Sequence, residues 1–236
     1  MPNELLLLLS VVLIFGGVLV FFNFFGIQGL YCWVALATIT ANIEVMILVD
    51  AFGMQQTLGN VMFASTFLVT DIISEIDGKK RAIHAVNVGI VTSLTFMILS
   101  QVWLLFTPSI YDQNFYYITG VFSNTPRIML SGLIVYAIVQ RFDVWLYHKW
   151  WDFTTGRFGD KRRFLWLRNN GSTLVSQILN TVLFTLFAFV GVYDFSTLIQ
   201  IMIASYTIFF FTTLLDTPGV YIARWLHERK QQKALV

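Results

Sequence analysis

The run LLLLLSVVLIFGGVLVFFNFF occupies Leu5–Phe25 and contains no charged side chain. About 20 apolar residues suffice to cross a hydrocarbon core of about 30 Å at a helical rise of about 1.5 Å per residue. Further apolar runs follow, and together they predict seven membrane spans, at about 4–25, 29–50, 57–76, 83–107, 122–147, 171–193 and 196–223. The runs are too uniformly apolar for barrel strands, and a helix satisfies its own backbone in lipid. The sequence therefore predicts an all-α, polytopic transmembrane helix bundle.

The first run differs from a secretory signal peptide. It has no basic segment before it and no small-residue cleavage site after it, and it is longer than a typical signal core. We expect it to be retained as a span.

Basic residues mark one side of the predicted membrane. Lys and Arg gather around 79–81, around 149–168 and in the tail, whereas Ser109–Gly120 and Tyr193–Ser196 contain none. Cytoplasmic loops carry such an excess of positive charge. The pattern predicts a multi-pass protein of the cell (inner) membrane, with its N-terminus outside and its C-terminus in the cytoplasm.

Composition narrows the function. The chain is 57% hydrophobic and 12% charged, and its net charge of +2 lies in loops beside the membrane, so no nucleic-acid partner is expected. Cys32 is the only cysteine and the three histidines lie at membrane edges or in the tail, so we expect neither a disulfide, a metal site nor a cofactor. There is no phosphate-binding loop and no nucleophile–base arrangement, and we predict that the protein is not an enzyme.

Ionisable groups at membrane depth are the candidates for function, because each costs at least about 2.5–3.5 kcal/mol at a helix centre and so faces the bundle interior. They are Glu44, Asp71, Glu75, Arg127 and Asp216, accompanied by the amides Asn42, Asn60, Gln177, Asn180 and Gln200. Asp71 and Glu75 lie one helical turn apart, so one of them is expected to be protonated or paired with a cation. Arg127 is expected either to snorkel or to pair with Glu44 or Asp50.

Other polar residues have a structural interpretation. Ser65, Thr66 and Ser172 are expected to join helices, and Arg141 and Asp143 to lie at the inner interface. Ser172, Ser176 and Asn180 follow one another at four-residue spacing and predict a polar stripe that lines a cavity or a helix contact. The short, polar third span is expected to be sheltered by its neighbours, and could be broken or tilted.

Five segments resemble a known family of bacterial membrane proteins. They are ATITAN (Ala37–Asn42), TLGNVMFASTFLVTDIISE (Thr57–Glu75), PRI (Pro126–Ile128), LRNNGSTLVSQILNT (Leu167–Thr181) and LLDTP (Leu214–Pro218). In this order and spacing they resemble the queuosine precursor transporter family, which is similar to vitamin uptake transporters. The family core has six spans. The resemblance therefore implies an extra N-terminal span (1–28), a six-span transporter core (29–224) and a basic cytoplasmic tail (225–236).

Two positions depart from the family pattern. Asn180 stands where the family commonly has an aspartate, and Phe209 stands where it commonly has a lysine. Losing an acid and a base together is nearly neutral in charge, whereas losing one would leave an expensive unpaired charge. We therefore hypothesise that Asn180 and Phe209 face each other across the sixth and seventh spans.

The resemblance implies import of a 7-deazaguanine-type nucleobase such as preQ0, preQ1 or queuine, by a facilitator or a proton-coupled carrier. A carboxylate would accept the two N–H donors of the base, amides would serve its remaining polar groups, and rings would stack on its plane. The predicted substrate-binding residues are Asn42, Glu44, Asn60, Phe63, Asp71, Gln177, Asn180 and Tyr206. Glu75, Arg127 and Asp216 are predicted to be structural or coupling charges.

Alternatives remain open at this point. The chain could be the substrate-binding subunit of an ATP-driven importer, with a separate energising subunit, and it could form a homodimer. An intramembrane enzyme with Asp71 and Asp216 as a carboxyl dyad, or a purely structural membrane protein, are the alternatives from other classes.

Overall fold

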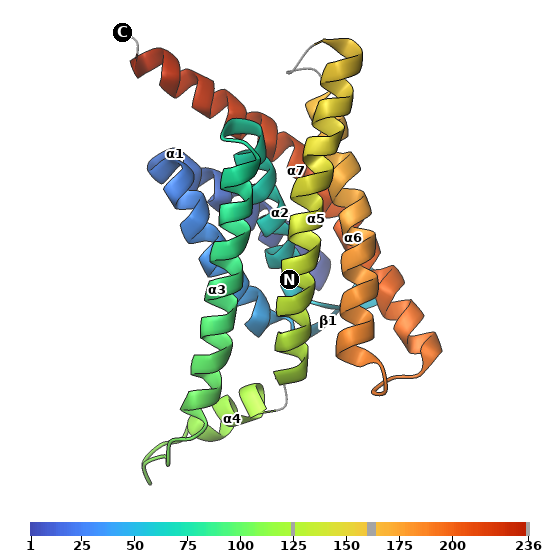
Figure 1. The fold of residues 1–236 in the computed structure, drawn as a ribbon. Helices are drawn as coiled ribbons and strands as arrows, with labels where there is room; N and C mark the ends of the chain where they lie inside the picture. Colours follow the sequence, from blue (N-terminus) through green and yellow to red (C-terminus); the bar gives the residue numbers. More distant parts are fainter. Residues whose placement is uncertain (124–125, 160–163, 235–236) are drawn as a thin grey trace.

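The computed structural model describes residues 1–123, 126–159 and 164–234. Helices dominate it, and the predicted all-α bundle is confirmed (Figure 1). The elements in chain order are α1 (Asn3–Glu44), β1 (Leu48–Ala51), β2 (Met54–Thr57), α2 (Gly59–Ile76), α3 (Lys79–Trp103), α4 (Phe115–Ser123), α5 (Pro126–Phe158), α6 (Leu165–Phe189) and α7 (Phe195–Ala234).

Helix α1 contains the first predicted span and most of the second. The chain reverses at Gly26, whose φ of 60° and ψ of −142° suit a residue without a Cβ atom. Beyond the turn the two halves touch, because the Trp33 ring packs edge-on against Phe21 at a centroid distance of 5.3 Å. A Cβ atom on Gly29 would lie 2.2 Å from the carbonyl oxygen of Phe21, so the turn requires glycine there as well.

The predicted end of the second span, at residue 50, is wrong. Helix α1 ends at Glu44, and the apolar residues that follow it form a β-hairpin in which Leu48 pairs with Thr57 and Ala51 with Met54. Phe52 and Gly53 both have positive φ, as a tight two-residue hairpin turn requires. The start of the chain is bound to this hairpin, because Asn3 Nδ2 donates to the Asp50 carbonyl (2.8 Å) and Glu4 Oε1 accepts from the Phe52 amide (3.1 Å).

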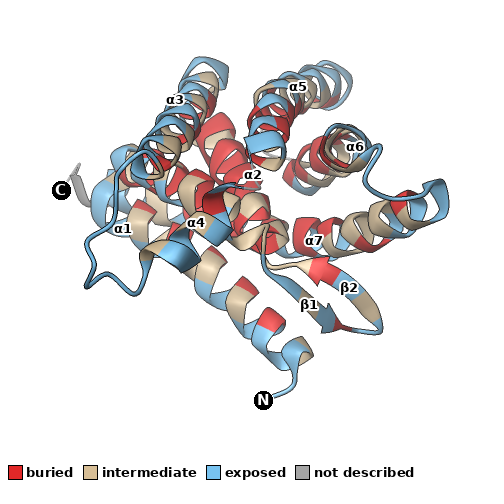
Figure 2. Ribbon diagram, turned by 90° about the horizontal axis from the view of Figure 1, so that it is seen from below, coloured by how far each residue is buried: buried red, intermediate tan, exposed pale blue. Residues whose placement is uncertain are grey.

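Helix α2 is the centre of the bundle. Figure 2 shows it surrounded by α1, α3, α5, α6 and α7, and it is buried along nearly its whole length. The predicted shelter of this polar span is therefore confirmed, and between Gly59 and Ile76 the helix is unbroken. Ser65 and Thr66 join helices as expected, since Trp33 Nε1 donates to Ser65 Oγ (3.0 Å) and Gln140 Nε2 to Thr66 Oγ1 (2.6 Å).

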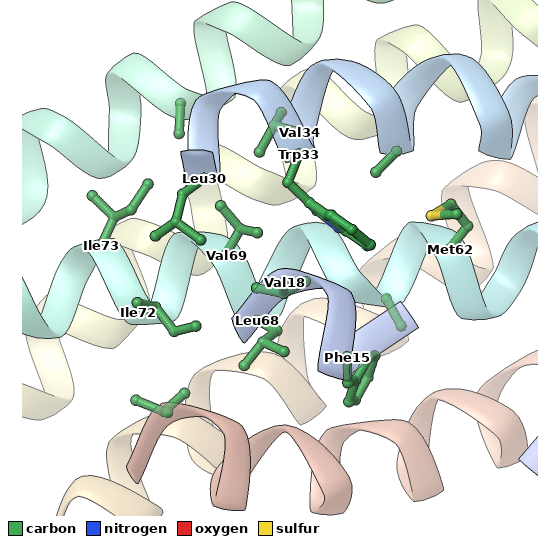
Figure 3. Packing of buried hydrophobic residues seen from close by; sticks show 14 of the residues in the cluster. Phe15, Val18, Leu30, Trp33, Val34, Met62, Leu68, Val69, Ile72 and Ile73 are labelled. Carbon is green, nitrogen blue, oxygen red and sulfur yellow. The ribbon is translucent and has the colours of Figure 1, made fainter. Parts of the chain in front are cut away.

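The apolar core lies between α2 and the two halves of α1. Phe15 and Val18 come from the first half of α1, Trp33 from the second and Leu68 from α2, and they meet in one cluster (Figure 3). Burial of apolar side chains between helices fixes the folded-back shape of α1 against α2.

The basic segments gather at one end of the bundle. The α2–α3 turn and the C-terminal ends of α5 and α7 all lie at the upper end in Figure 1, whereas α4 and the α6–α7 turn lie at the opposite end. Lys161, Arg162 and Arg163 fall outside the described residues. Helix α4 is a feature the sequence did not predict, since its exposed Tyr116 and Tyr117 suggest only interfacial anchors.

Five described helices are long and apolar enough to cross a membrane: α1, α3, α5, α6 and α7. Helix α2 is not among them, because its polar residues lower its hydropathy. The count of seven spans, with two in α1, stays a prediction.

We predict that Gly29→Ala destabilises the protein, because the new methyl group would press on the Phe21 backbone. Overpacking of this kind costs about 1–3 kcal/mol in the free energy of unfolding. Gly16 is the matched control, since a Cβ atom there has nothing within 4 Å. Unfolding of both variants in detergent measures the difference, and an equal effect of the two substitutions would contradict this account of the turn.

Candidate functional site

A cavity lies in the half of the bundle opposite the basic end. Its walls are the last turns of the second half of α1, the first turns of α2, α5 and α7, and the last turns of α6, with Ser93 of α3. Its empty volume is about 840 Å³, counting the space at its mouth. Among the described residues that line it, none carries a charge.

Amides and aromatic rings give the cavity its chemical character. The amides are Asn42, Asn60 and Asn180, and the rings are Phe63, Tyr136, Phe184, Phe189 and Phe209. Phe63 lies at the floor, with its ring centroid 6.1 Å from that of Tyr136 and 6.2 Å from that of Phe209. Ser and Thr hydroxyls complete the wall, so the cavity combines hydrogen-bonding groups with flat apolar surfaces.

The Asn42 amide is held in a fixed orientation. Its Nδ2 atom donates to the Thr38 carbonyl (2.7 Å) and to Ser93 Oγ (2.9 Å). Both N–H groups are thus used, and the remaining oxygen can accept a hydrogen bond from a ligand. Oδ1 of Asn42 faces Gly132, where a Cβ atom would lie 3.7 Å away.

The cavity brings together half of the predicted binding residues. Asn42, Asn60, Phe63 and Asn180 line it, and so does Phe209. Glu44, Asp71, Gln177 and Tyr206 do not belong to the lining; Gln177 supports it from behind, because its Oε1 accepts from Asn180 Nδ2 (3.1 Å).

An ionic cluster lies in the basic half of the bundle, between α2, α5, α6 and α7. Both Glu75 oxygens accept from Arg168, with Nη2 at 2.7 Å and Nε at 3.0 Å, and Oε1 also accepts from Arg224 Nη1 (3.0 Å). The Tyr147 hydroxyl donates to Oε2 (2.8 Å), and the Arg168 guanidinium stacks on the Trp151 ring at 4.2 Å. The sequence predicts that either Asp71 or Glu75 is protonated or paired with a cation. Glu75 is the residue that is paired with a cation.

Arg168 is a residue that sequence reasoning missed. It reads as a loop residue before a span that starts at 171, but α6 begins at Leu165 and buries the side chain completely. The signal available in the sequence is that Arg168 lies within the family-like run LRNNGSTLVSQILNT. A fully buried arginine is stable only with a well-placed acid, and Glu75 supplies it.

One further expectation is wrong, and one of the two alternatives for Arg127 is ruled out. Asp143 does not lie at the inner interface; it is fully buried, with Ser176 of α6 close to it. Arg127 does not pair with Glu44 or Asp50. Its Nε donates to the Phe187 carbonyl (3.0 Å) and its Nη2 to the Val190 carbonyl (2.6 Å), where the C-terminal end of α6 offers unpaired carbonyls and a negative dipole end.

Comparison with known proteins agrees with this architecture. The family described as "Putative vitamin uptake transporter" matches residues 57–223, which span α2 to most of α7. The chain belongs to this vitamin uptake transporter family. A relative from Bacillus subtilis (strain 168), named "Probable queuosine precursor transporter", is 38% identical over 207 residues, covering 88% of each chain. No solved structure matches the chain.

Membership of the vitamin uptake transporter family, together with the apolar helices, makes this a multi-pass membrane protein of a transporter family. The matched region contains the ionic cluster and most of the cavity wall, while the α1 residues of the wall lie before it.

We predict that Glu75→Gln destabilises the vitamin uptake transporter fold strongly, because Arg168 would be left buried without its carboxylate. Breaking a buried ion pair from one side costs about 3–5 kcal/mol. Asp77→Asn is the control. Its exposed pair with Arg81, at 3.6 Å, should change the free energy of unfolding by less than about 1 kcal/mol. Equal stability of the two variants in detergent unfolding would show that the cluster is not a structural link.

Asn180 and Phe209 line the same cavity, and the hypothesis that they replace an acid–base pair gives a second prediction. Asn180→Asp alone should destabilise the protein by up to about 3 kcal/mol, as an unpaired carboxylate does at membrane depth. Adding Phe209→Lys should recover part of this loss. Unfolding of the four members of the cycle measures the coupling, and strictly additive effects would remove the hypothesis.

Proposed function

We propose that this protein imports a queuosine precursor, a 7-deazaguanine-type nucleobase, across the cell (inner) membrane. Two observations support the proposal: the 38% identity to a relative named as such a transporter, and a cavity of amides and aromatic rings that suits a small flat heterocycle. The cavity carries the argument, because it provides hydrogen-bonding edges and stacking faces together.

The cavity would recognise the base through its polar edge. Asn42 offers a fixed carbonyl oxygen to an N–H donor, and Asn60, whose side chain forms no hydrogen bond with other described residues, offers both an acceptor and donors. Phe63 and Phe209 would cover the ring faces. A carboxylate from Glu44 or Asp71 remains a prediction, and neither belongs to the cavity wall in this conformation.

The uncharged wall bears on which precursor is preferred. preQ0 carries a neutral cyano group, whereas the aminomethyl group of preQ1 and the amine of queuine are cations near neutral pH. A cation moved into an uncharged, partly apolar cavity loses hydration without gaining a counter-charge. We propose that the neutral cyano form is the favoured substrate.

The position of the cavity supports import as the direction of transport. It lies in the half opposite the basic ends, which the positive-inside rule places outside the cytoplasm, and the ionic cluster of Glu75 closes the other half. The substrate would enter from outside, and opening of the inner half would release it. The sequence has no ATP-binding loop, so the carrier would be a facilitator or coupled to an ion gradient.

We predict that Asn60→Leu reduces uptake of labelled preQ0 into proteoliposomes about 10- to 100-fold, the effect of leaving a hydrogen-bonding group of the ligand unpaired. Asn23→Leu is the matched control, since Asn23 is exposed and remote from the cavity. Equal loss in the two variants, or none in either, would contradict the assignment of the cavity.

Uptake into the same vesicles also tests which deazaguanine is preferred and whether a separate energising subunit is needed. Uptake should rank preQ0 above preQ1 and queuine, and guanine and unrelated vitamins should compete weakly. If the purified chain binds preQ0 but moves it only when ATPase and coupling subunits are added, it is a binding subunit of a larger importer. If it binds none of the deazaguanines, the proposal fails.

A further inference from the structure

Three acidic side chains are buried in the interior of the bundle. Asp71 comes from α2, Asp143 from α5 and Asp216 from α7, and each has at most 1% of its surface exposed. The carboxyl groups of Asp143 and Asp216 interact electrostatically with that of Asp71 and with each other. Three distant parts of the sequence thus bring like-charged groups within electrostatic range of one another.

These carboxyl groups have little that compensates a negative charge. Within the described residues none of the three forms an ion pair, and the only hydrogen bond they accept is from Thr173 Oγ1 to Asp71 Oδ2 (3.2 Å). Ser176 Oγ is fully buried, lies close to Asp143 without hydrogen-bond geometry, and has no other partner in the described structure.

The nearby charged groups belong to the ionic cluster. On the inner side, Glu75 of α2 faces Asp71, and Tyr147 of α5, Arg168 of α6 and Arg224 of α7 bind Glu75. The positive charges of the two arginines are therefore paired directly with the Glu75 carboxylate. Three neighbouring carboxylates cannot all stay ionised in the interior of the bundle, because burial and mutual repulsion both disfavour the charged form.

We propose that Asp71, Asp143 and Asp216 form a proton-binding site that couples a proton gradient to transport. A proton is the cation that requires no coordination sphere. No group of three acidic, cysteine or histidine side chains among the described residues is arranged to hold a metal ion. This inference rests on the proposed transport function and extends it with a driving ion and a location.

Helix α6 connects this proton-binding site to the cavity. Asn180 lines the cavity and donates to Gln177 one turn away. Ser176, next to Gln177, lies close to Asp143, and Thr173, one turn further along, donates to Asp71. A carboxyl group that gains a proton becomes a hydrogen-bond donor. It can then donate to Ser176 Oγ, which an ionised carboxylate cannot do, so protonation would change the hydrogen bonds along the helix that carries the cavity wall.

Infrared spectroscopy of the protein in proteoliposomes tests the site without any substrate. A buried protonated carboxyl group gives a C=O band that shifts on deuteration. We expect this band near neutral pH in the wild type, its reduction in Asp71→Asn, Asp143→Asn or Asp216→Asn, and its retention in Asp77→Asn, an exposed control. Absence of the band in the wild type across the stable pH range would overturn the proposal, even if a variant fails to fold.

A gradient experiment tests the coupling. Wild-type vesicles with an inward proton gradient should accumulate labelled preQ0, whereas the Asp143→Asn and Asp216→Asn variants should exchange it across the membrane without concentrating it. Unchanged accumulation in both variants, or accumulation driven by sodium alone, would overturn the coupling. If the infrared band behaves as expected but no deazaguanine moves, the proposed substrate is wrong while the proton-binding site stands.

Discussion

The central helix α2 is too polar to face lipid, and the rest of the bundle is arranged to cover it. It carries Asp71 and Glu75 one turn apart, with hydroxyl groups above them, through the middle of an apolar protein. Each exposed charge would cost several kcal/mol in hydrocarbon. The folded-back α1, α3, α5 and α7 pack directly on α2, and α6 supplies the bond to Asp71.

The two halves of the bundle meet this constraint differently. In the half near the hairpin, α2 presents Asn60 and Phe63 to an uncharged cavity. In the basic half it presents carboxyl groups, and arginines from α6 and α7 bind Glu75 there. Because of this division, one helix can line a site for a neutral ligand and also carry carboxyl groups that can bind a proton. In the proposed coupling, the hydrogen bonds along α6 link the two.

Side-chain type and depth in the sequence single out several residues of the candidate site. Asn42, Asn60, Phe63 and Asn180 are polar or aromatic residues within apolar runs, and all four line the cavity. Asp143 and Arg168 could not be placed in this way, because they lie near predicted span ends and helix limits are uncertain by several residues. A shift of one turn decides whether such a residue faces the interface or the interior.

The sequence alone determined the class of this protein: long apolar helices, basic residues on one side and a sheltered polar third span, because the thickness and polarity of a bilayer leave few other solutions. Only the tertiary structure decided the partners. Which guanidinium reaches Glu75, which carbonyls Arg127 binds and which acids meet Asp71 all depend on how helices are rotated and packed. A contact between residues 149 positions apart, such as that of Arg224 with Glu75, has no signature in local sequence spacing.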